Sequence, residues 1–313
     1  MSIIERVAEL LGPIERPNSK SSAPGEKGGI PDLDPIEHAV SEITERSGFP
    51  EFRKLTAQPE AKARPAHPTS GTTRTLRVDR DQLRRQSMIT PDGERSPIAE
   101  SFRRIKRQIL ANVANSKPGA PANLVMVTSA LAGEGKTFCA INLAISIALE
   151  MDHTVLLVDA DVANPCVPQA LGVEAEKGLM DVLLDRRIDL AEVLCKTDID
   201  KVTILPAGTA HPHATELLAS DAMRVLLQEM AERHRDRIVI FDSPPLLASS
   251  ESAVLASQMG QVVMVVETGK TSEAALKNAL SRIESSNIAG LVLNKVEGPG
   301  LEYGYGGYGY GAK

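Results

Sequence analysis

A glycine-rich loop between a strand-like segment and a helix-like segment constrains this chain more than any other feature of its sequence. The apolar run LVMVT at 124–128 leads directly into SALAGEGKT at 129–137, and the apolar segment FCAINLAISIAL follows at 138–149. Gly133 and Gly135 let the backbone curl so that successive N–H groups point at one anion, while the start of a helix adds its dipole. The sequence therefore predicts a phosphate-binding loop between a strand and a helix.

Two side chains at the end of this loop have the chemistry that a nucleoside triphosphate requires. Lys136 can reach the β- and γ-phosphates, and the Thr137 hydroxyl can hold Mg²⁺. The strict form of the motif has glycine at position 130, where this chain has Ala130. We predict that the chain binds ATP with Mg²⁺. The residues expected to line the nucleotide are Gly133, Glu134, Gly135, Lys136, Thr137 and Phe138.

Short runs rich in Val and Ile alternate with amphipathic segments through the rest of the chain's body. Continuous apolar runs are typical of parallel strands that are covered on both faces. Such strand–helix alternation over roughly 200 residues predicts the α/β class, with a doubly wound, mostly parallel sheet of the P-loop NTPase fold. The ligand site is expected at the carboxyl ends of the strands. The predicted strands lie at 124–128, 155–159, 202–205, 238–242, 262–267 and 291–294.

Polar residues end several of these runs, where a nucleotide-binding sheet needs them. The run VLLVDAD supplies Asp159 and Asp161, and IVIFDSPP supplies Asp242. If both runs flank the first strand, the three carboxylates converge opposite Lys136. Phosphoryl transfer needs carboxylate-ordered metal ligands and a group that positions or deprotonates the nucleophile; alternatively, such Asp residues cap helices or turns. Asn294 ends the last run, where its amide can contact a purine ring or hydrogen-bond a loop.

The first 92 residues lack the strand–helix pattern. They are rich in Pro, Ser, Lys and Arg, so we expect them to bury too little apolar surface to offset the entropy of ordering. Two amphipathic islands, at 3–11 and 36–43, predict short helices that dock a partner or pack on the body. The arginine-rich stretch 74–85 is interpreted as a solvated linker, with a membrane-surface or nucleic-acid patch as the alternative. This organisation predicts a flexible N-terminal region at 1–92, a P-loop domain at 93–297 and a tail at 298–313.

The tail contains every tyrosine of the chain. The chain has 4 tyrosines and no Trp. An extended chain from Lys295 onward could span roughly 50 Å at ~3.4 Å per residue, enough to reach the phosphate site of a neighbouring subunit. The tyrosines are therefore candidate phosphate acceptors, and the alternative is a low-complexity adhesive tail. They are Tyr303, Tyr305, Tyr308 and Tyr310, interleaved with glycine.

Charge, cysteine content and hydropathy exclude several other classes. A net charge of −6 argues against a general affinity for nucleic acid. The 3 cysteines have no CxxC spacing and indicate reduced thiols rather than a disulfide framework. No apolar run approaches the ~20 residues that a membrane-spanning helix needs. We therefore expect a cytoplasmic protein that does not cross the membrane by itself.

These motifs together resemble one known family, the bacterial tyrosine autokinases (BY-kinases) of polysaccharide export. The resemblance covers residues 93–313 and rests on SALAGEGKT as Walker A, VLLVDAD as Walker A′, IVIFDSPP as Walker B, and the segments LPAG and ELLAS. The tyrosine cluster after a Walker A′ motif is its most specific part. With its N-terminal region, the chain is most similar to the exosortase-associated cytoplasmic members, whose membrane-spanning activator is a separate polypeptide.

The resemblance implies an ATP- and Mg²⁺-dependent tyrosine autokinase that controls exopolysaccharide synthesis or export. It implies that Lys136 and Thr137 bind phosphates and Mg²⁺, that Asp161 and Asp242 order the metal, and that Asp159 helps to deprotonate the incoming tyrosine. It also implies phosphorylation between subunits of a ring-like homo-oligomer. The activator is expected to be of the polysaccharide chain-length-determinant type and to hold the kinase at the inner face of the membrane.

Two positions depart from the family pattern. The family's ring-building helix has the motif E-x-x-R-x-x-R, and this chain has Glu100, Arg103 and then Lys106. A lysine keeps the charge and loses the bidentate fork of arginine. The Walker A′ motif of the family continues with Arg, whereas this chain has Val162–Pro165 (VANP).

Two other functions remain open at this stage. The first is an ATPase switch of the cell-division or partitioning type, whose members carry a second lysine early in the phosphate loop; here the loop begins Ser-Ala-Leu-Ala at 129–132. The second is a nucleotide-binding regulatory subunit with little catalysis, which the missing arginine after Asp161 would fit.

Overall fold

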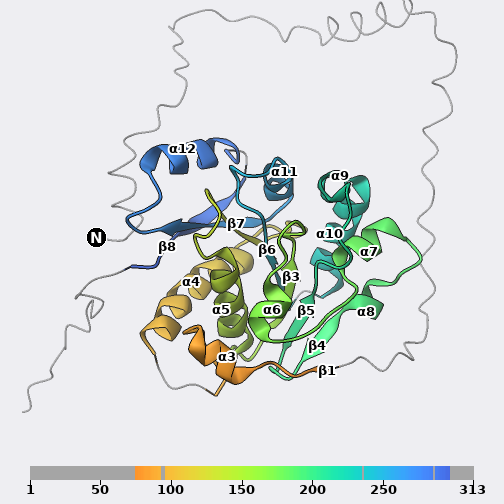
Figure 1. Ribbon diagram of the computed structural model, residues 1–313, viewed down its shortest axis with the longest axis horizontal. Helices are drawn as coiled ribbons and strands as arrows, with labels where there is room; N and C mark the ends of the chain where they lie inside the picture. The colour runs from red at the N-terminus through yellow and green to blue at the C-terminus, as the bar shows by residue number, and fades with distance from the viewer. Residues whose placement is uncertain (1–74, 93–95, 235, 285, 297–313) are drawn as a thin grey trace, which may run out of the picture. The chain divides into compact units, whose positions relative to one another are not determined.

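The computed structural model describes residues 75–92, 96–234, 236–284 and 286–296, which form an α/β unit built on one sheet (Figure 1). The strands are β1 (Thr75–Leu76), β2 (Leu124–Ser129), β3 (Thr154–Asp159), β4 (Cys195–Thr197), β5 (Val202–Leu205), β6 (Arg237–Asp242), β7 (Gln261–Glu267) and β8 (Ile288–Asn294). They form an 8-stranded sheet in the order β1-β4-β5-β3-β6-β2-β7-β8. Among these neighbours only β4 and β5 run antiparallel. The predicted doubly wound, mostly parallel sheet is confirmed.

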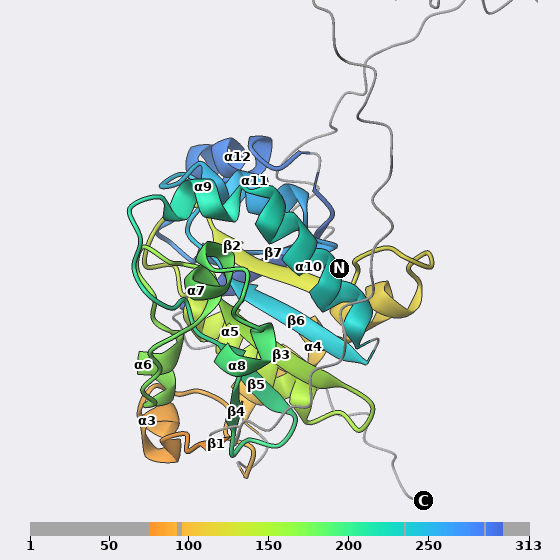
Figure 2. The same cartoon turned by 90° about the vertical axis from the view of Figure 1, so that its right-hand side faces the viewer.

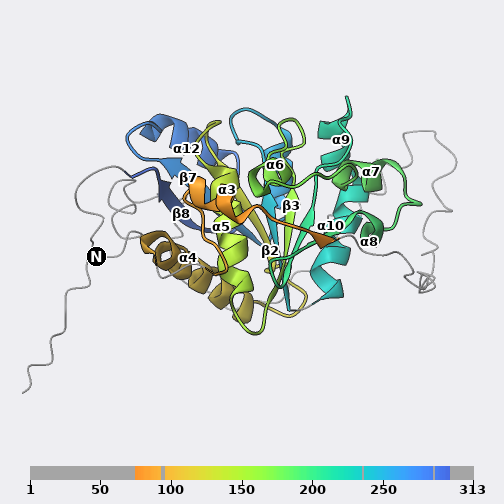
Figure 3. The ribbon, with the colours of Figure 1, turned by 60° about the horizontal axis from the view of Figure 1, so that its bottom comes forward.

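Helices cover both faces of the sheet, as the two turned views show (Figure 2 and Figure 3). One face carries α3 (Arg80–Arg85), α4 (Pro97–Ala114), α5 (Lys136–Ala148) and α6 (Val167–Leu171). The other face carries α7 (Leu179–Leu184), α8 (Leu190–Val193), α9 (Ala214–Leu218), α10 (Asp221–Arg233), α11 (Glu251–Ser257) and α12 (Glu273–Ser281). The sheet is thus the middle of three layers, which explains why its central strands are apolar on both faces.

The strand β2 shows how the two cores arise. Its side chains point alternately to opposite faces, so that Leu124 and Met126 enter one apolar core and Val125 and Val127 enter the other. All four are at most 1% exposed. Burying a side chain of this kind contributes roughly 1.5–3 kcal/mol. This double coverage fixes the end of β2 firmly, and the phosphate loop starts from that end.

The strand order places the acidic residues slightly differently from the expectation. The convergence was argued for the case in which both acidic strands flank β2, but only β6 does, and β3 lies one strand further away beside β6. In register, Asp242 pairs with Val127 on one side and with Asp159 on the other. Because all three strands are parallel, their carboxyl ends still meet at one edge of the sheet. The site is therefore assembled across three adjacent strands.

The folded unit begins earlier than the sequence suggested. Residues 75–92 were expected to belong to a flexible region and a solvated linker, which is wrong: β1 pairs with β4, and α3 packs on α6. Leu83 is fully buried and Val78 is 2% exposed. The apolar residues of this short segment have no clear period, so only their tertiary partners reveal their burial. The other residues of the predicted N-terminal region, 1–74, and the tail from 297 lie outside the described residues.

In the part of the chain that the structure describes, none of the helices has the length and hydropathy needed to span a bilayer.

Candidate nucleotide-binding site

The phosphate loop connects β2 to α5 in the predicted place. Gly133 and Gly135 have φ angles of 83° and 95°, a backbone region that residues other than glycine rarely adopt. Gly135 also lies directly under the side-chain amide of Asn294, which would overlap a Cβ atom at that position. Ala130 is fully buried, so the methyl group that replaces the motif's first glycine is accommodated by the apolar core.

Side chains from the ends of β7 and β8 hold the loop from outside. The Asn294 amide donates to the carbonyl of Glu134 at 2.9 Å, and the Lys295 ammonium donates to the carbonyl of Gly133 at 2.7 Å. The buried Glu134 carboxylate accepts hydrogen bonds from the backbone N–H of Leu131, at 2.8 Å, and from the hydroxyl of Thr271. Of the two roles considered for Asn294, the structure shows the contact with a loop.

Thr271 and Lys295 were missed by sequence reasoning. Lys295 directly follows a predicted strand, and this position at the carboxyl end of the sheet was its only indication of a role near the site. Thr271 follows β7 in a turn with no motif, so its contact with the phosphate loop could not be foreseen from the sequence.

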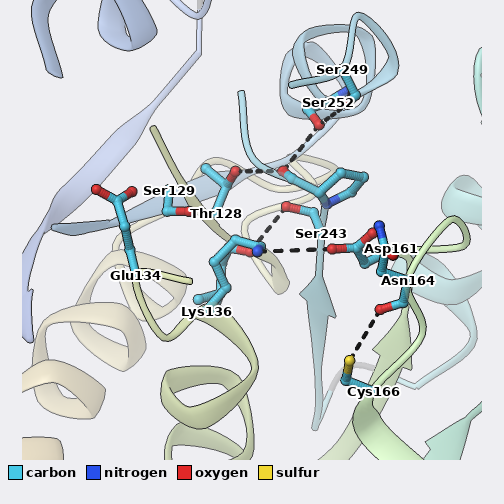
Figure 4. A network of polar contacts seen from close by, with 12 residues as sticks. Thr128, Ser129, Glu134, Lys136, Asp161, Asn164, Cys166, Ser243, Ser249 and Ser252 are labelled. Atoms are coloured by element: carbon cyan, nitrogen blue, oxygen red, sulfur yellow. Dashed lines mark hydrogen bonds and ion pairs between the residues drawn. The ribbon is translucent and has the colours of Figure 1, made fainter. Parts of the chain in front are cut away.

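The three predicted carboxylates lie at the carboxyl ends of β3 and β6, and Figure 4 shows Asp161 beside Lys136 at the start of α5. Asp159 and Asp242 are fully buried, and Asp161 is 8% exposed. The ammonium of Lys136, itself 8% exposed, points toward Asp161, with 3.8 Å between Nζ and Oδ2. The fold thus brings together the lysine and the three acids predicted from the sequence.

Buried oxygens in this cluster lack hydrogen-bond partners among the residues that the structure describes. They are both carboxylate oxygens of Asp242 and one each of Asp159 and Asp161. The second oxygen of Asp159 accepts the backbone N–H of Val167 at 2.9 Å. An unpaired buried carboxylate is costly, so this arrangement suits a cation that supplies the missing partner.

The pKa values of these acids reflect the same shortage of partners. Burial raises the pKa of Asp159 to about 7, and the charge of Asp161 adds to the rise, while the Val167 N–H opposes it. Burial also raises the pKa of Asp242 to about 7, with the Thr137 hydroxyl and the charge of Lys136 opposing the rise. The pKa of Asp161 is raised by burial, and the charge of Lys136 again opposes the shift.

The donors in this cluster fit Mg²⁺. Hard oxygen ligands are what this ion prefers, and it is usually bound by one or two carboxylates together with water and substrate phosphates. Among the described residues, no group of three or more His, Cys, Asp or Glu side chains is arranged to hold a metal by itself. A magnesium site here would therefore combine Thr137 and a carboxylate with oxygens of the nucleotide.

Hydroxyl groups support the segment after Asp242. Thr128 and Ser252 both donate to the carbonyl of Pro244, at 2.9 and 3.0 Å, and Ser243 donates to the carbonyl of Val127 at 2.9 Å (Figure 4). All three donors are fully buried. These bonds tie the end of β6 to β2 and α11, so the backbone around Asp242 is held in a fixed position. The sequence motif gave no indication of this support.

The helix α4 carries the residues expected to contact another subunit. Glu100 and Arg103 form an ion pair of 2.7 Å on the helix surface, with side chains 42% and 38% exposed. Lys106 differs from the expectation, because it is only 5% exposed. Its ammonium donates to the carbonyl of Ser146 at 2.8 Å and pairs with Glu150 at 2.6 Å. In this structure Lys106 therefore joins α4 to the end of α5 and is not available at the surface.

Substitution of Lys106 should therefore affect stability. In Lys106→Met the Ser146 carbonyl and Glu150 lose their charged donor, and a hydrogen bond to a charged group contributes about 1.5–3 kcal/mol. We expect the free energy of unfolding to fall by about 2 kcal/mol in urea denaturation. Arg104→Met removes an exposed cation from the same helix and should change it by less than about 0.5 kcal/mol. Equal stability of the two variants would contradict an inward role for Lys106.

The sheet, the glycine-rich loop and the lysine facing strand-end carboxylates define a P-loop nucleotide-binding domain. In agreement, residues 122–289 match the protein family described as AAA domain. The chain is 31% identical over 241 residues to tyrosine-protein kinase YwqD of Bacillus subtilis (strain 168), covering 76% of this chain and 97% of that protein. It is 34% identical over 176 residues to tyrosine-protein kinase etk of Escherichia coli (strain K12), covering 56% of this chain and 24% of etk.

Solved structures agree with these relatives. The kinase domain of Escherichia coli tyrosine kinase ETK superposes with a TM-score of 0.52 at 31% identity, over 60% of this chain and 72% of that domain. The chimerical protein CapA2B2 gives a TM-score of 0.59 at 24% identity, over 71% and 94%, and supports the fold. The chain belongs to the bacterial tyrosine-protein kinases. It spans nearly the whole of YwqD but about a quarter of etk.

Proposed function

We propose that this protein is an ATP- and Mg²⁺-dependent tyrosine kinase that phosphorylates its own C-terminal tyrosines. The observation that carries the proposal is the position of Lys136, buried at the start of α5 and facing Asp161 at 3.8 Å beside unpaired carboxylate oxygens. This arrangement offers a cation for the phosphates and oxygen ligands for a metal. Family membership supports tyrosine as the acceptor. Since every tyrosine of the chain lies in the tail, the acceptors within this chain are tail residues.

Each residue of the site has a proposed role. The backbone N–H groups of 133–138 bind the phosphates, and Lys136 neutralises charge on the group that is transferred. Thr137, Asp161 and Asp242 hold Mg²⁺, which when bound orders the phosphates and stabilises negative charge. Asp159 accepts the proton of the incoming tyrosine hydroxyl, a role that a carboxylate of raised pKa suits.

The last described strand ends beside the phosphate loop. The strand β8 ends at Asn294, whose amide is hydrogen-bonded to the phosphate loop, as is Lys295. From there an extended chain can reach roughly 50 Å, which is enough to enter the site of another copy. We propose that the tyrosines 303, 305, 308 and 310 are phosphorylated between subunits, in a ring-like homo-oligomer to which Glu100 and Arg103 contribute.

The cellular setting of this activity is also a proposal. We propose regulation of exopolysaccharide synthesis or export at the inner face of the membrane, through a separate membrane-spanning activator of the chain-length-determinant type. Resemblance of the motifs to the exosortase-associated members supports this setting, and the net charge of −6 supports a role without nucleic acid.

Intact-mass analysis of the protein made in cells tests this function. The wild type should show a ladder with steps of about 80 Da, one for each added phosphate. A variant with all 4 tyrosines replaced by phenylalanine should show a single mass and should still bind ATP. A ladder that persists in this variant would place the phosphate on other residues. A single mass for the wild type, even with ATP, Mg²⁺ and a membrane activator added, would favour an ATPase switch or a regulatory subunit.

A further inference from the structure

The segment Thr75–Asp92, here named the N-terminal strap, packs against α5, which carries Lys136, and against α6, which is hydrogen-bonded to Asp159. It consists of β1, α3 and the turn that follows, and the side chains of Leu83 and Ile89 are buried in it. The catalytic roles proposed above use none of its residues. The strap is nevertheless hydrogen-bonded to α6, and α6 is hydrogen-bonded to Asp159 of the site.

The strap donates hydrogen bonds to backbone carbonyls at the carboxyl end of α6. The backbone N–H of Asp79 donates to the carbonyl of Leu171 at 3.0 Å. The side-chain amide of Gln82 donates to the carbonyls of Gln169 and Ala170, at 2.5 and 3.1 Å. The last carbonyls of a helix have no partner inside the helix. The strap therefore supplies donors to three consecutive carbonyls at the end of α6, of which that of Gln169 also accepts the backbone N–H of Gly172.

The other end of α6 is bound to Asp159. The N–H of Val167, the first residue of α6, donates to Oδ2 of Asp159 at 2.9 Å, and Val167 is only 1% exposed. The Oδ1 atom of the same carboxylate has no partner within the described residues. This helix is 5 residues long. A movement at its carboxyl end therefore reaches the Asp159 carboxylate within about one and a half turns.

The contact between the strap and α6 is tight. Gly172, which follows α6 with a φ of 66°, has no side chain, and a Cβ atom there would lie 2.7 Å from the Cβ of Asp79. The strap is also held on α5, because the Ile89 N–H donates to the buried side chain of Asn142 at 2.7 Å. The strap thus rests on a fixed support and presents Gln82 to α6.

We propose that Gln82 is a positioning residue for tyrosine phosphorylation, holding the carboxyl end of α6 so that the Val167 N–H stays on the Asp159 carboxylate. This inference rests on the proposed function of Asp159. Without the Gln82 amide, α6 gains freedom and the carboxylate rotates away from the geometry in which its free oxygen faces the incoming hydroxyl. The nucleotide is bound through α5 and the phosphate loop, so its affinity does not depend on this contact.

Steady-state kinetics with Gln82→Met tests the proposal. This substitution keeps the length of the side chain and removes its donors. We expect kcat for tyrosine phosphorylation to fall about tenfold while KM for ATP stays within about twofold of the wild type. Gln86→Met changes an exposed glutamine at the end of the same helix and should leave both constants unchanged. An unchanged kcat in Gln82→Met, or a matching loss in Gln86→Met, would overturn the proposal.

A second measurement keeps the proposal separate from the kinase function. Amide hydrogen exchange should become faster in the peptide that contains Val167 in Gln82→Met, and should stay unchanged in the peptide of the phosphate loop. In Gly172→Ala the added Cβ would clash with Asp79 at the same contact between α6 and the strap, so this variant should give the same local change. If the wild type proves inactive on tyrosine, the proposed kinase function fails, but hydrogen exchange still tests the contact. Protection of the Val167 peptide in Gln82→Met that equals the wild type would refute the positioning role.

Discussion

Replacing Lys136 by methionine should reduce tyrosine phosphorylation by at least about 100- to 1,000-fold, the loss expected when a preorganised group that stabilises transition-state charge is removed. The Lys136 ammonium is 8% exposed and lies 3.8 Å from Asp161, in a setting where charges act more strongly than in water. Methionine has a similar length and no charge, so the loop should keep its shape. Phosphotyrosine measured with ATP and Mg²⁺ checks this expectation.

The matched control for this substitution is Lys270→Met. Lys270 lies in the turn that follows β7, where its side chain is 68% exposed and pairs with Glu267 at 3.4 Å. Removing that exposed charge should leave phosphotyrosine formation within about twofold, because surface ion pairs contribute little. Equal labelling of Lys136→Met and the wild type would contradict a kinase site at this loop.

The same variant distinguishes phosphorylation within a chain from phosphorylation between chains. Lys136→Met keeps its tail and should serve as an acceptor for a wild-type protein from which residues 303–313 have been removed. The truncated partner has a complete site and no tyrosine, so any phosphotyrosine that forms must lie on the variant. If the mixture yields none although the wild type labels itself, the transfer takes place within one chain.

The central sheet and the acidic cluster could be predicted because each rests on a local pattern. The runs that became β2, β3 and β6 are apolar throughout, which only strands covered on both faces require. Asp159 and Asp242 end such runs, and parallel strands bring their ends to one edge of the sheet. The loop 129–137 adds a short motif whose chemistry is readable without the rest of the chain.

The features that escaped prediction depend on tertiary partners. Lys106 occupies the position of a surface arginine in the family motif, and only the packing of α4 on α5 turns it inward to Ser146. The N-terminal strap has a charged composition, yet Leu83 is fully buried against other elements. Thr271 reaches Glu134 across 137 positions of the chain. Contacts of this kind leave no periodic signal, which explains why the folded unit was expected to start at 93 rather than 75.

Replacing Asp242 by asparagine should stabilise the nucleotide-free protein and abolish its response to ATP and Mg²⁺. Among the described residues, neither buried carboxylate oxygen makes a hydrogen bond of ordinary geometry. Burial raises the pKa of Asp242 to about 7, and the nearby Thr137 hydroxyl only partly opposes this rise. A carboxyl group with a folded-state pKa above its unfolded value contributes stability that is fully present at low pH. This contribution declines as the pH rises from about 4 to about 7, because the unfolded chain releases the proton over this range while the folded state still holds it.

Thermal unfolding between pH 5 and 8 checks this expectation. At pH 8 without nucleotide, Asp242→Asn should unfold about 4–8 °C above the wild type, equivalent to about 2 kcal/mol for a domain of this size. Its midpoint should also fall less than that of the wild type between pH 5 and 7, because the substituted group no longer ionises. ATP with Mg²⁺ should raise the midpoint of the wild type and leave that of the variant nearly unchanged, since a ligand stabilises only the state that binds it.

Asp152→Asn is the matched control, because it removes a carboxylate that is exposed in the loop between α5 and β3. That variant should follow the wild type in both pH dependence and response to ATP. A nucleotide-free Asp242→Asn protein that is less stable than the wild type at pH 8 would show that the ionised carboxylate stabilises the fold. A full response to ATP and Mg²⁺ would show that Asp242 is not a metal ligand. The combination expected here, greater stability with lost function, arises because the carboxylate that destabilises the nucleotide-free protein is the one proposed to hold the metal.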